Sequence, residues 1–512
     1  QEPLCTYRIA NFKTTSDDKD AGAAFLKYKD FKPYVDYFNS MEDENIAQAI
    51  PNARASQWME ENIPLFECSQ KNFEEMYYYR WWTLRKHIKE TPVGYGMTEF
   101  LVNRSYADKY NLIACAIGHH IYESRWLRNP EYLNQIIHTW YRGNEGGPMA
   151  KMTKFSSWNA DAVLGRYMVD GNKEFLLDMV KDLEAEYARW EKTNRLPNGL
   201  YWQGDVQDGM EESISGGRRK QYARPTINSY MYGNAKALSL IGIMTGDEGM
   251  AMKYGLKADS IKTLVQDKLW NTDHHFFETM RGDASAEVRE AIGYIPWYFN
   301  LPDASSKYTV AWKEVMDEKG FSAPYGLTTA ERRHPEFRTH GVGKCEWDGA
   351  IWPFASAQTL TAMANFMNNY PQTVLTDSVY FHQMERYVES QHHRGRPYIG
   401  EYLDEVTGYW LKGDQERSRY YNHSTFNDLM ITGLIGLRPR MDNTVEVNPL
   451  IPEGKWDYFC LDNVLYHGRN LTILWDKDGS RYQRGKGLHI YVDGKEVGHA
   501  DTLTRVLCEN VL

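Results

Sequence analysis

The sequence predicts a mainly α-helical protein: a toroid of helical hairpins followed by a small antiparallel β domain. Through the middle of the chain, apolar residues recur at spacings of three and four, the period of an amphipathic helix. Pairs of these helical segments are joined by short turns. Near residue 438 the pattern changes to short alternating strands. These three observations together define the predicted fold class.

The clearest hairpin spans residues 158–190. WNADAVLGRYM (158–168) predicts one apolar helix, and VDGN (169–172) is a compact glycine turn. The helix after the turn has one apolar stripe, formed by Leu176, Val180, Leu183, Tyr187 and Trp190. Two helices joined by such a short turn make an αα-hairpin.

The same arrangement recurs twice further along the chain. Residues 235–244 and 250–270 flank the turn TGDE, and residues 353–367 and 373–391 flank NNYP. Several hairpins in sequence indicate either a toroid or a solenoid. Because the hairpins differ in sequence and are separated by long polar loops, we expect a closed toroid with the loops gathered over one end.

The two ends of the chain have a different character. LTILW (471–475) and LHIYV (488–492) have strand patterns, and Asp493-Gly494 is a two-residue hairpin signal. The first 65 residues are mixed and polar. We therefore predict three parts: an N-terminal segment that packs on the barrel (1–65), a helical barrel (66–437) and a C-terminal β domain (438–512).

The composition of the chain limits the kinds of partner that it can bind and indicates where in or outside the cell it acts. A formal net charge of −10 argues against a nucleic-acid partner, because phosphate contacts need clustered Lys and Arg. No apolar run reaches the ~18 residues that indicate a membrane span. The chain begins at Gln1, as after removal of a signal peptide or in a shortened sequence, and we expect a periplasmic or extracellular location. Most of the six cysteines are expected to be buried thiols.

Aromatic residues make up 14 % of the chain, with 16 Trp and 36 Tyr. Their rings combine a flat apolar face with a polar edge, which suits the C–H faces and hydroxyl groups of sugars. A large aromatic core would give the same composition. Composition alone therefore supports sugar handling and core packing equally.

Two acid-rich loops carry the candidate chemistry. DGMEESISGG (208–217) places Asp208, Glu211 and Glu212 just before a glycine turn, and YIGEYLDEVTGYWLKGD (398–414) places Glu401 close to Tyr409. Glycoside cleavage needs two carboxyl groups, one that protonates the departing oxygen and one that attacks or activates water. The alternative for either loop is a solvated acidic surface or a helix N-cap.

Seven stretches between residues 77 and 437 carry a resemblance: YYYRWWTLRKHI, SSWNADA, QDGMEESISGG, RPTINSYMYGNA, CEWDGAIWP, GEYLDEVTG and YYNHSTFNDLMITGLIGL. Together they resemble the inverting glycosidases with an (α/α)6 barrel, in particular the group of mannosylglycerate hydrolase and the processing α-glucosidases. The most specific motif is WDGAIWP (347–353), which matches the W-x-G-x-x-W-P signature of that group. The resemblance implies an inverting glycoside hydrolase that acts on an oligo- or polysaccharide as an exo-acting α-glycosidase.

The resemblance also implies roles for the acids. A GM-acid segment before an NSYMY-like helix start carries the general acid of the group, which falls here on Glu211. A segment that ends in T-G carries the general base, which falls on Glu401. Many relatives have Asp at the acid, and proline is common where this chain has Glu405, so Asp208 remains an alternative general acid.

Further residues of these motifs are predicted to bind substrate: Arg80, Trp81, Trp158, Asp161, Asn228, Tyr230, Trp347, Asp348, Trp352, Tyr409 and His423. A structural role is the alternative for most of them. The tryptophans could fill the barrel wall, Trp158 and Asp161 could start a helix, and His423 could be a packed core histidine. At most one of Trp81 and Trp82 can face a site, because adjacent side chains on a helix point apart.

The sequence predicts a carbohydrate substrate, no cofactor and no metal. The GxSxG and GxxxxGK[ST] motifs are absent, and His119 and His120 have no carboxylate beside them at metal-ligand spacing. Two other functions remain open. A polysaccharide lyase or unsaturated-uronyl hydrolase would show a Tyr/His/Arg cluster for uronate, and a non-catalytic glycan-binding protein would bind sugar without releasing reducing ends.

Overall fold

The structure, a computed structural model, describes residues 25–512. Cys5 and the first part of the predicted N-terminal segment lie outside the described residues. The helices α1 (Lys32–Ser40) and α2 (Asn52–Asn62) follow, and both contact α3 (Lys71–Lys86). The described part of the N-terminal segment therefore packs against the first long helix of the barrel.

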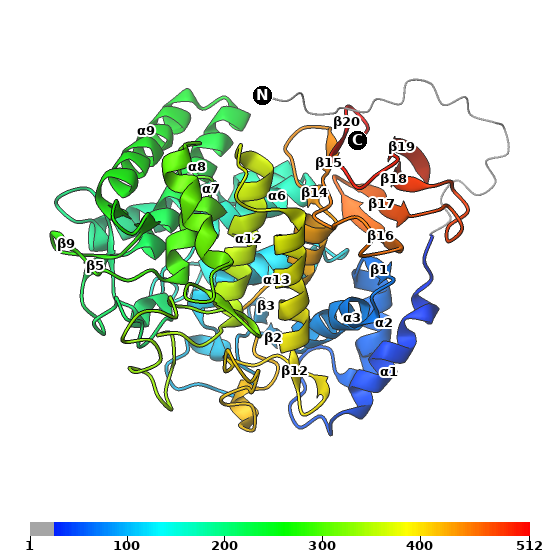
Figure 1. Ribbon diagram of the computed structural model, residues 1–512, viewed down its shortest axis with the longest axis horizontal. Helices are drawn as coiled ribbons and strands as arrows, with labels where there is room; N and C mark the ends of the chain where they lie inside the picture. The colour runs from blue at the N-terminus through cyan, green and yellow to red at the C-terminus, as the bar shows by residue number, and fades with distance from the viewer. Residues whose placement is uncertain (1–24) are drawn as a thin grey trace.

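A closed ring of helices forms the centre of the molecule (Figure 1). Within the described residues, six helices contact one another in turn, and the last returns to the first: α4 (Ile117–Ser124), α6 (Asn159–Asp170), α8 (Pro225–Thr245), α10 (Ile295–Tyr298), α12 (Pro353–Asn369) and α14 (Asn427–Leu429). A π-helical turn, Met430–Leu434, extends α14. The ring confirms the predicted toroid, since the ends of a solenoid stay apart.

A second set of helices alternates with the ring along the chain and covers its outside: α3, α5 (Glu131–Arg142), α7 (Lys173–Asn194), α9 (Glu248–Leu264) and α13 (Asp377–Ser390). Between α10 and α12 this place is taken by α11 (Ser306–Thr309) and the 3-10 turn Val310–Val315. α7 contacts α6 and α8, whereas α13 contacts α12 and α3. The outer layer therefore bridges neighbouring members of the ring.

The predicted hairpin turns rest on glycines and side-chain caps. Gly171 ends α6 and Gly246 ends α8, with φ angles of 66° and 73° that favour glycine. Asn172 and Asp247 then accept hydrogen bonds from backbone N–H groups in the first turns of α7 and α9. These local signals explain why the helix–turn–helix units could be predicted from the sequence.

Two predicted helix starts were wrong. α8 begins at Pro225 rather than residue 235, because proline is well suited to a first helical turn and the residues after it are buried helix. α13 begins at Asp377 rather than residue 373. There the side chain of Gln372 accepts hydrogen bonds from the backbone of Val374 and Leu375 and so holds a turn in place of a helix.

Two antiparallel sheets form the C-terminal part, as predicted. The larger has the order β1 (Leu65–Cys68), β16 (Tyr458–Tyr466), β17 (Arg469–Asp476), β18 (Gly487–Val492) and β19 (Lys495–Ala500). The smaller contains β14 (Leu437–Arg438), β15 (Val445–Val447) and β20 (Val506–Cys508). Asp493 and Gly494 make the β18–β19 turn with φ angles of 50° and 79°. β1 was not predicted, and it joins the start of the barrel to this sheet.

Short strands stabilise the connecting loops, which spread over the left and lower side of the view in Figure 1. They are β2 (Ile88–Thr91), β3 (Gly94–Met97), β4 (Trp202–Gln203), β5 (Tyr222–Ala223), β6 (Trp270–Asn271), β7 (Phe276–Phe277), β8 (Met280–Arg281), β9 (Ala284–Ser285), β10 (Ser322–Ala323), β11 (Gly326–Leu327), β12 (His392–His393) and β13 (Arg396–Pro397). The loops that connect outer helices to inner ones include both predicted acid loops.

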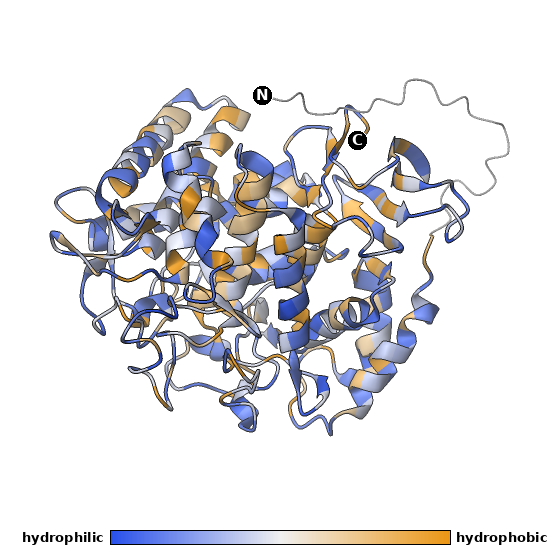
Figure 2. Cartoon of the chain, in the orientation of Figure 1, coloured by the Kyte–Doolittle hydropathy of each residue, from blue (hydrophilic) through white to orange (hydrophobic). Residues whose placement is uncertain are grey.

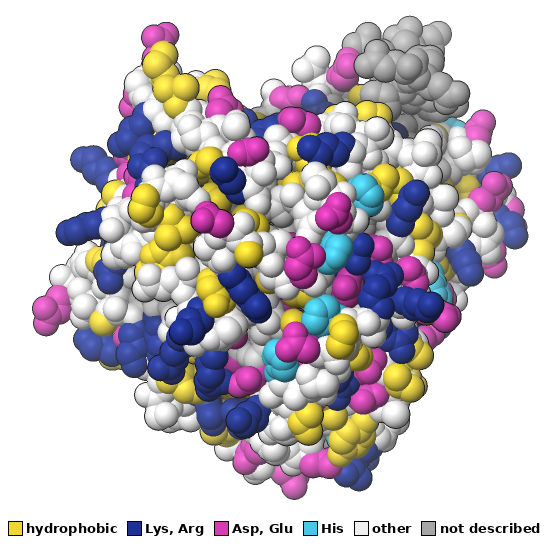
Figure 3. Space-filling model, turned by 60° about the vertical axis from the view of Figure 1, so that its left-hand side comes forward, with side chains coloured by type: hydrophobic (Ala, Val, Ile, Leu, Met, Phe, Trp, Pro, Cys, Tyr) yellow, Lys and Arg dark blue, Asp and Glu magenta, His cyan; other side chains and the backbone are white. Residues whose placement is uncertain are grey.

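The hydrophobic core runs through the ring and into the C-terminal sheets (Figure 2). Nine of the 16 tryptophans are less than 2 % exposed, so core packing accounts for much of the aromatic content. The five described cysteines are free, and all but Cys345 are buried. On the face shown in Figure 3, basic, acidic and hydrophobic side chains are mixed. No helix in residues 25–512 has the length and apolar character of a membrane span.

Candidate active site

Asp208 anchors the first acid loop to the start of α8. Its Oδ2 accepts hydrogen bonds from Arg224 Nε at 2.7 Å and Thr226 Oγ1 at 2.5 Å, and its Oδ1 accepts one from Ser156. The side chains of Asp208 and Arg224 are both 0 % exposed. A carboxylate that is ion-paired and sealed from solvent has no access to a substrate. The structure therefore places Asp208 behind the site, as a support for the loop.

Asp208→Asn is expected to lower the free energy of unfolding by about 3–5 kcal/mol, because it leaves the guanidinium of Arg224 buried without a charged partner. Urea unfolding measures the effect. Glu212→Gln is the matched control in the same loop, since the Glu212–Arg218 pair lies at the surface and should contribute less than about 1 kcal/mol. Equal losses in the two variants would contradict the anchoring role.

Glu211 lies in the same loop but in a different environment. Its side chain is partly exposed, and it makes no hydrogen bond to another described residue. The surrounding protein desolvates the carboxyl group and raises its pKa to about 7; the charges of Asp205 and Glu401 add to this shift, and Lys412 opposes it. A carboxyl group with this pKa keeps its proton often enough near neutral pH to act as a general acid.

Glu401 is held by two cations. Lys412 Nζ donates to Oε2 at 3.0 Å, and a guanidinium nitrogen of Arg417 lies 3.3 Å from Oε1. The side chain of Glu401 is 4 % exposed. Leu403, two residues later, forms a β-bridge with Ile351 at the start of the ring helix α12, which fixes the loop against the barrel. The sequence analysis did not identify Lys412 or Arg417.

The two glutamates lie in one site. The negative charge of Glu401 helps to raise the pKa of Glu211. Burial, followed by the charges of Glu211 and Glu401 among others, also raises the pKa of the Cys345 thiol to about 12. Because such charge effects weaken with distance, the two acid loops and the segment before the W-x-G motif converge on one place.

Glu99 is a third carboxyl group in this site that sequence reasoning missed. It is 3 % exposed, and it accepts hydrogen bonds from Tyr421 OH at 3.0 Å and Cys115 Sγ at 3.3 Å. Burial raises its pKa to about 8, and the charges of Glu401 and Glu211 contribute in the same direction. The sequence held one signal that could have indicated Glu99: it is a single glutamate inside the apolar run GMTEFLV (96–102). Burying a carboxyl group costs free energy, so a glutamate in a buried run suggests a function.

Glu99→Gln is expected to change how stability depends on pH. The pKa of Glu99 is about 8 in the folded protein and ~4.3 in an unfolded chain, so the folded state holds an extra proton between these values. The free energy of unfolding therefore falls as the pH rises through this interval. Glutamine removes this contribution, which is on the order of a few kcal/mol.

Urea unfolding at about pH 5 and about pH 8 tests this expectation. The stability of Glu99→Gln relative to the wild type should rise between the two pH values. A relative stability that does not change with pH would contradict the placement of a protonated Glu99.

Stacked aromatic rings flank the carboxyl groups. Trp352 stacks on Trp347 with ring centroids 4.8 Å apart and on Tyr402 at 4.6 Å. The indole N–H groups of Trp347 and Trp352 are buried and have no hydrogen-bond partner in residues 25–512. Tyr402 directly follows Glu401, so the stack links the W-x-G motif to the second acid loop. From the sequence, Trp347 and Trp352 could either bind a sugar or fill the wall of the barrel. The structure places them beside the segment that carries Glu401.

The remaining predicted residues near the second loop have different surroundings. The ring of His423 packs against Tyr421 with ring centroids 4.0 Å apart, and its Nε2 has no hydrogen-bond partner in the part of the chain that the structure describes. Asp348 is buried and accepts hydrogen bonds from the backbone N–H groups of residues 340 and 341, so it supports a loop. Tyr409 is 46 % exposed and donates to Asp414 at 2.7 Å, on the outer part of the loop.

Asn228 and Tyr230 support the first acid loop from α8. The amide of Asn228 pairs with both backbone groups of Tyr201 and donates to the backbone oxygen of Arg224 at 2.8 Å. Tyr230 OH accepts a hydrogen bond from Gln358 at 2.8 Å. Both side chains are buried, so they position the loop and the ring rather than present polar groups to solvent.

Four other predicted residues are buried in the core or line a cavity away from the glutamates. Arg80 is buried and donates to Gln391 and Ser424, and Trp81 is a core residue with 0 % exposure. Trp158 is equally buried and donates to Tyr298. Asp161 lines a separate cavity at the opposite end of the ring. The sequence motifs predicted these four residues to bind substrate. In the structure, Arg80, Trp81 and Trp158 are buried in the core, and Asp161 lines the other cavity.

Comparison with known proteins identifies the family. Residues 109–424 match the family described as the mannosylglycerate hydrolase MGH1-like glycoside hydrolase domain. The chain belongs to this family. Residues 437–499 match the C-terminal domain of glycosyl hydrolase family 65. The resemblance to a glycoside hydrolase family that was drawn from the motifs is therefore confirmed.

Solved structures agree with this assignment. A structure named "Sialidase" is 83 % identical, with a TM-score of 0.95; the match covers 97 % of this chain but only 46 % of that protein, so the chain spans about half of its length. The GH63 mannosylglycerate hydrolase from Thermus thermophilus in complex with glucose is 11 % identical over 70 % of this chain and 99 % of that one, with a TM-score of 0.50. The GH78 family rhamnosidase of Bacillus sp. GL1 is 11 % identical over 81 % and 40 %, with a TM-score of 0.55. The last two show the shared fold.

Proposed function

We propose that this chain is a glycoside hydrolase that acts on an oligo- or polysaccharide, exo-acting and inverting, with Glu211 as the general acid and Glu401 as the general base. The observation that carries the proposal is the contrast between two carboxyl groups in one site. Glu211 has a pKa of about 7 and no hydrogen bond to another described residue, whereas Glu401 is ion-paired with Lys412 and Arg417. A proton donor facing a carboxylate is the arrangement that inverting hydrolysis uses.

The proposed reaction moves one proton at each carboxyl group. Glu211 donates its proton to the glycosidic oxygen as the bond to the anomeric carbon breaks. Glu401 accepts a proton from a water molecule that attacks the opposite face of that carbon. Lys412 and Arg417 hold Glu401 in one orientation during this step. Exchange of protons with solvent then restores both groups.

Exo action on an α-linkage is supported by the sequence resemblance to the processing α-glucosidases. The stacked rings of Trp347, Trp352 and Tyr402 give one apolar wall beside Glu401, which suits the C–H face of a sugar. A panel of α- and β-linked oligosaccharides, with release of terminal and internal units followed by chromatography, tests the linkage and the mode of attack.

The anomeric configuration of the first product tests the mechanism. Proton NMR during the first minutes of hydrolysis should show a product of configuration opposite to that of the substrate. Retention would instead require a covalent intermediate and a carboxyl separation of ~5–5.5 Å rather than ~6.5–9.5 Å, and it would overturn the assignment of Glu401 as a base.

A further inference from the structure

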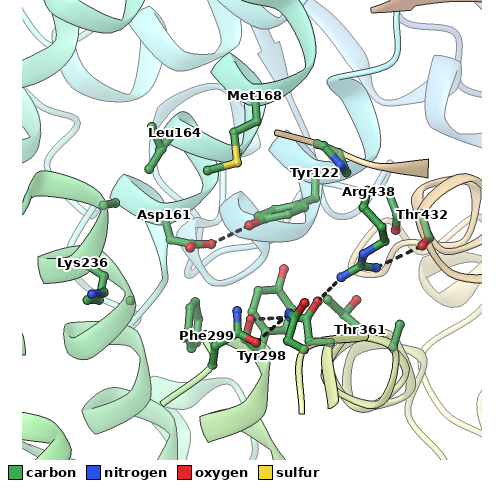
Figure 4. A pocket seen from close by; sticks show the side chains of 18 of the residues that line it. Tyr122, Asp161, Leu164, Met168, Lys236, Tyr298, Phe299, Thr361, Thr432 and Arg438 are labelled. Carbon is green, nitrogen blue, oxygen red and sulfur yellow. Dashed lines mark hydrogen bonds between the residues drawn. The ribbon is translucent and has the colours of Figure 1, made fainter. Parts of the chain in front are cut away.

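A second cavity, of about 590 Å³, lies on the axis of the helical ring (Figure 4). The ring helices α4, α6, α8, α10 and α12 all contribute to its wall, and the segment around β14 closes one side. Its volume falls within the ~300–1,000 Å³ that is typical of small-molecule sites. None of Glu99, Glu211 and Glu401 lines it.

The cavity lies at the end of the ring opposite the candidate active site. α8 starts beside the first acid loop, where Asn228 holds that loop, but it reaches the cavity through Lys236 and Leu240. At ~1.5 Å per helical residue, these lie about 12 Å and about 18 Å further along the axis than Asn228. On α12, Thr361 also lies well beyond the catalytic end, which begins at Trp352.

Most charged groups of the cavity are paired. Arg125 is ion-paired with Asp428 at 2.8 Å, and Arg440 is paired with Glu446 at 2.8 Å and with Asp442, which lies outside the lining, at 2.7 Å. The remaining ionisable residues of the lining are Lys236, Arg438 and Asp161. The lining therefore holds four basic residues and three acidic ones, and burial raises the pKa of Asp161 to about 7.

Arg438 and Asp161 lie on two sides of the cavity and are bound by neutral groups (Figure 4). Arg438 donates to the backbone oxygen of Thr432 at 3.0 Å and to Asn365 Oδ1 at 2.6 Å. Asp161 Oδ2 accepts a hydrogen bond from Tyr122 OH at 2.6 Å. The structure thus builds fixed polar groups into both walls.

Several polar atoms of the lining keep unused hydrogen-bonding capacity. Among the described residues, nothing bonds to the second carboxyl oxygen of Asp161, the hydroxyl of Thr361, the Nδ2 of Asn300 or the Nζ of Lys236. Apolar and aromatic side chains lie among these polar groups: Leu164 and Met168 on the same helix as Asp161, Leu240 on the same helix as Lys236, and Tyr298 and Phe299 next to Asn300. Hydrogen-bonding atoms beside ring faces suit a polyhydroxyl ligand.

We propose that this cavity is a second ligand site that binds a polyhydroxyl molecule of monosaccharide size. The excess of basic residues in the lining disfavours an amino sugar. The unpaired acceptor of Asp161 and the hydroxyl of Thr361 would bind ligand hydroxyl groups, and Tyr298 and Phe299 would contact its C–H face. The proposal is independent of the roles assigned to Glu211 and Glu401.

Isothermal titration with D-glucose, D-galactose and D-mannose, and with D-glucuronate as the charged comparison, tests the proposal. Thr361→Trp places a large side chain in the cavity and should abolish sugar binding there. The rate of glycoside hydrolysis at the candidate active site should not change. Asp161→Asn keeps the side-chain shape but replaces an acceptor with a donor, and should weaken binding at least fivefold. Asp170→Asn, on the same helix but outside the cavity, should bind like the wild type.

Crystals soaked in the sugar that binds best locate the site, and density between Asp161 and Thr361 is the expected result. Two outcomes would overturn the proposal: no saturable binding of any of the four sugars, or binding that Thr361→Trp and Asp161→Asn both leave unchanged. If Thr361→Trp does not fold, Asp161→Asn and its Asp170→Asn control decide the question.

Discussion

Glu211→Gln is expected to lower kcat on the order of 10³-fold, with little change in KM or in the folded structure. Glutamine has nearly the same shape but carries no proton that it can donate to the leaving oxygen. Glu211 makes no hydrogen bond to another described residue, so its replacement removes no structural contact of that kind. Steady-state kinetics on the natural linkage measures the loss, and circular dichroism checks the fold.

The pH profile and the leaving group make this test specific. With a pKa of about 7, Glu211 loses its proton as the pH rises, so wild-type kcat/KM should fall on the alkaline side of about pH 7. The variant should lack this limb. It should also lose far less rate on a nitrophenyl glycoside, whose leaving group needs little protonation. The control Glu212→Gln should retain nearly full activity, and equal losses in both variants would refute the assignment.

Glu401→Gln is expected to lower kcat at least as strongly, on the order of 10³- to 10⁴-fold. The amide cannot accept a proton from the attacking water, and it no longer balances the charges of Lys412 and Arg417. In contrast to the acid variant, an activated leaving group should not restore the rate, because the missing step is the activation of water.

Glu416→Gln provides the matched control for Glu401→Gln. Glu416 lies in the same loop, but its side chain is 55 % exposed and only 3.8 Å from a single arginine, Arg419. Its replacement should leave kcat within about twofold, since exposed ion pairs contribute little. If Glu401→Gln hydrolyses the natural linkage at a rate close to that of Glu416→Gln, Glu401 is not the base.

The fold was predictable because its signals are local. The turn after α6 needs only Gly171 and Asn172, and the β18–β19 hairpin needs only Asp493 and Gly494, all of which can be read over a few residues. β1 carries no comparable signal. It is a strand because it pairs with β16 near the other end of the chain, which no local pattern reports.

The site was predictable only in part, for a related reason. Glu211 and Glu401 stand in loops with recognisable motifs, whereas Glu99 is a single residue whose role depends on meeting them when the ring closes. Charge alone also could not separate Asp208 from Glu211. The difference arises from Arg224, which pairs with Asp208 in the core, whereas the side chain of Glu211 has no ion-pair partner among the described residues and stays partly exposed. Asp161 is a different case. Its motif predicted a residue of the substrate site, but its side chain lines the cavity at the other end of the ring.

The pairing of β1 with β16 joins residues about 400 positions apart. While the protein is being synthesised, Leu65–Cys68 has no partner until Tyr458–Tyr466 has left the ribosome. Until then its free backbone groups offer an edge to any neighbouring chain. The edge of β1 is therefore covered only once β16 has been made, long after β1 itself.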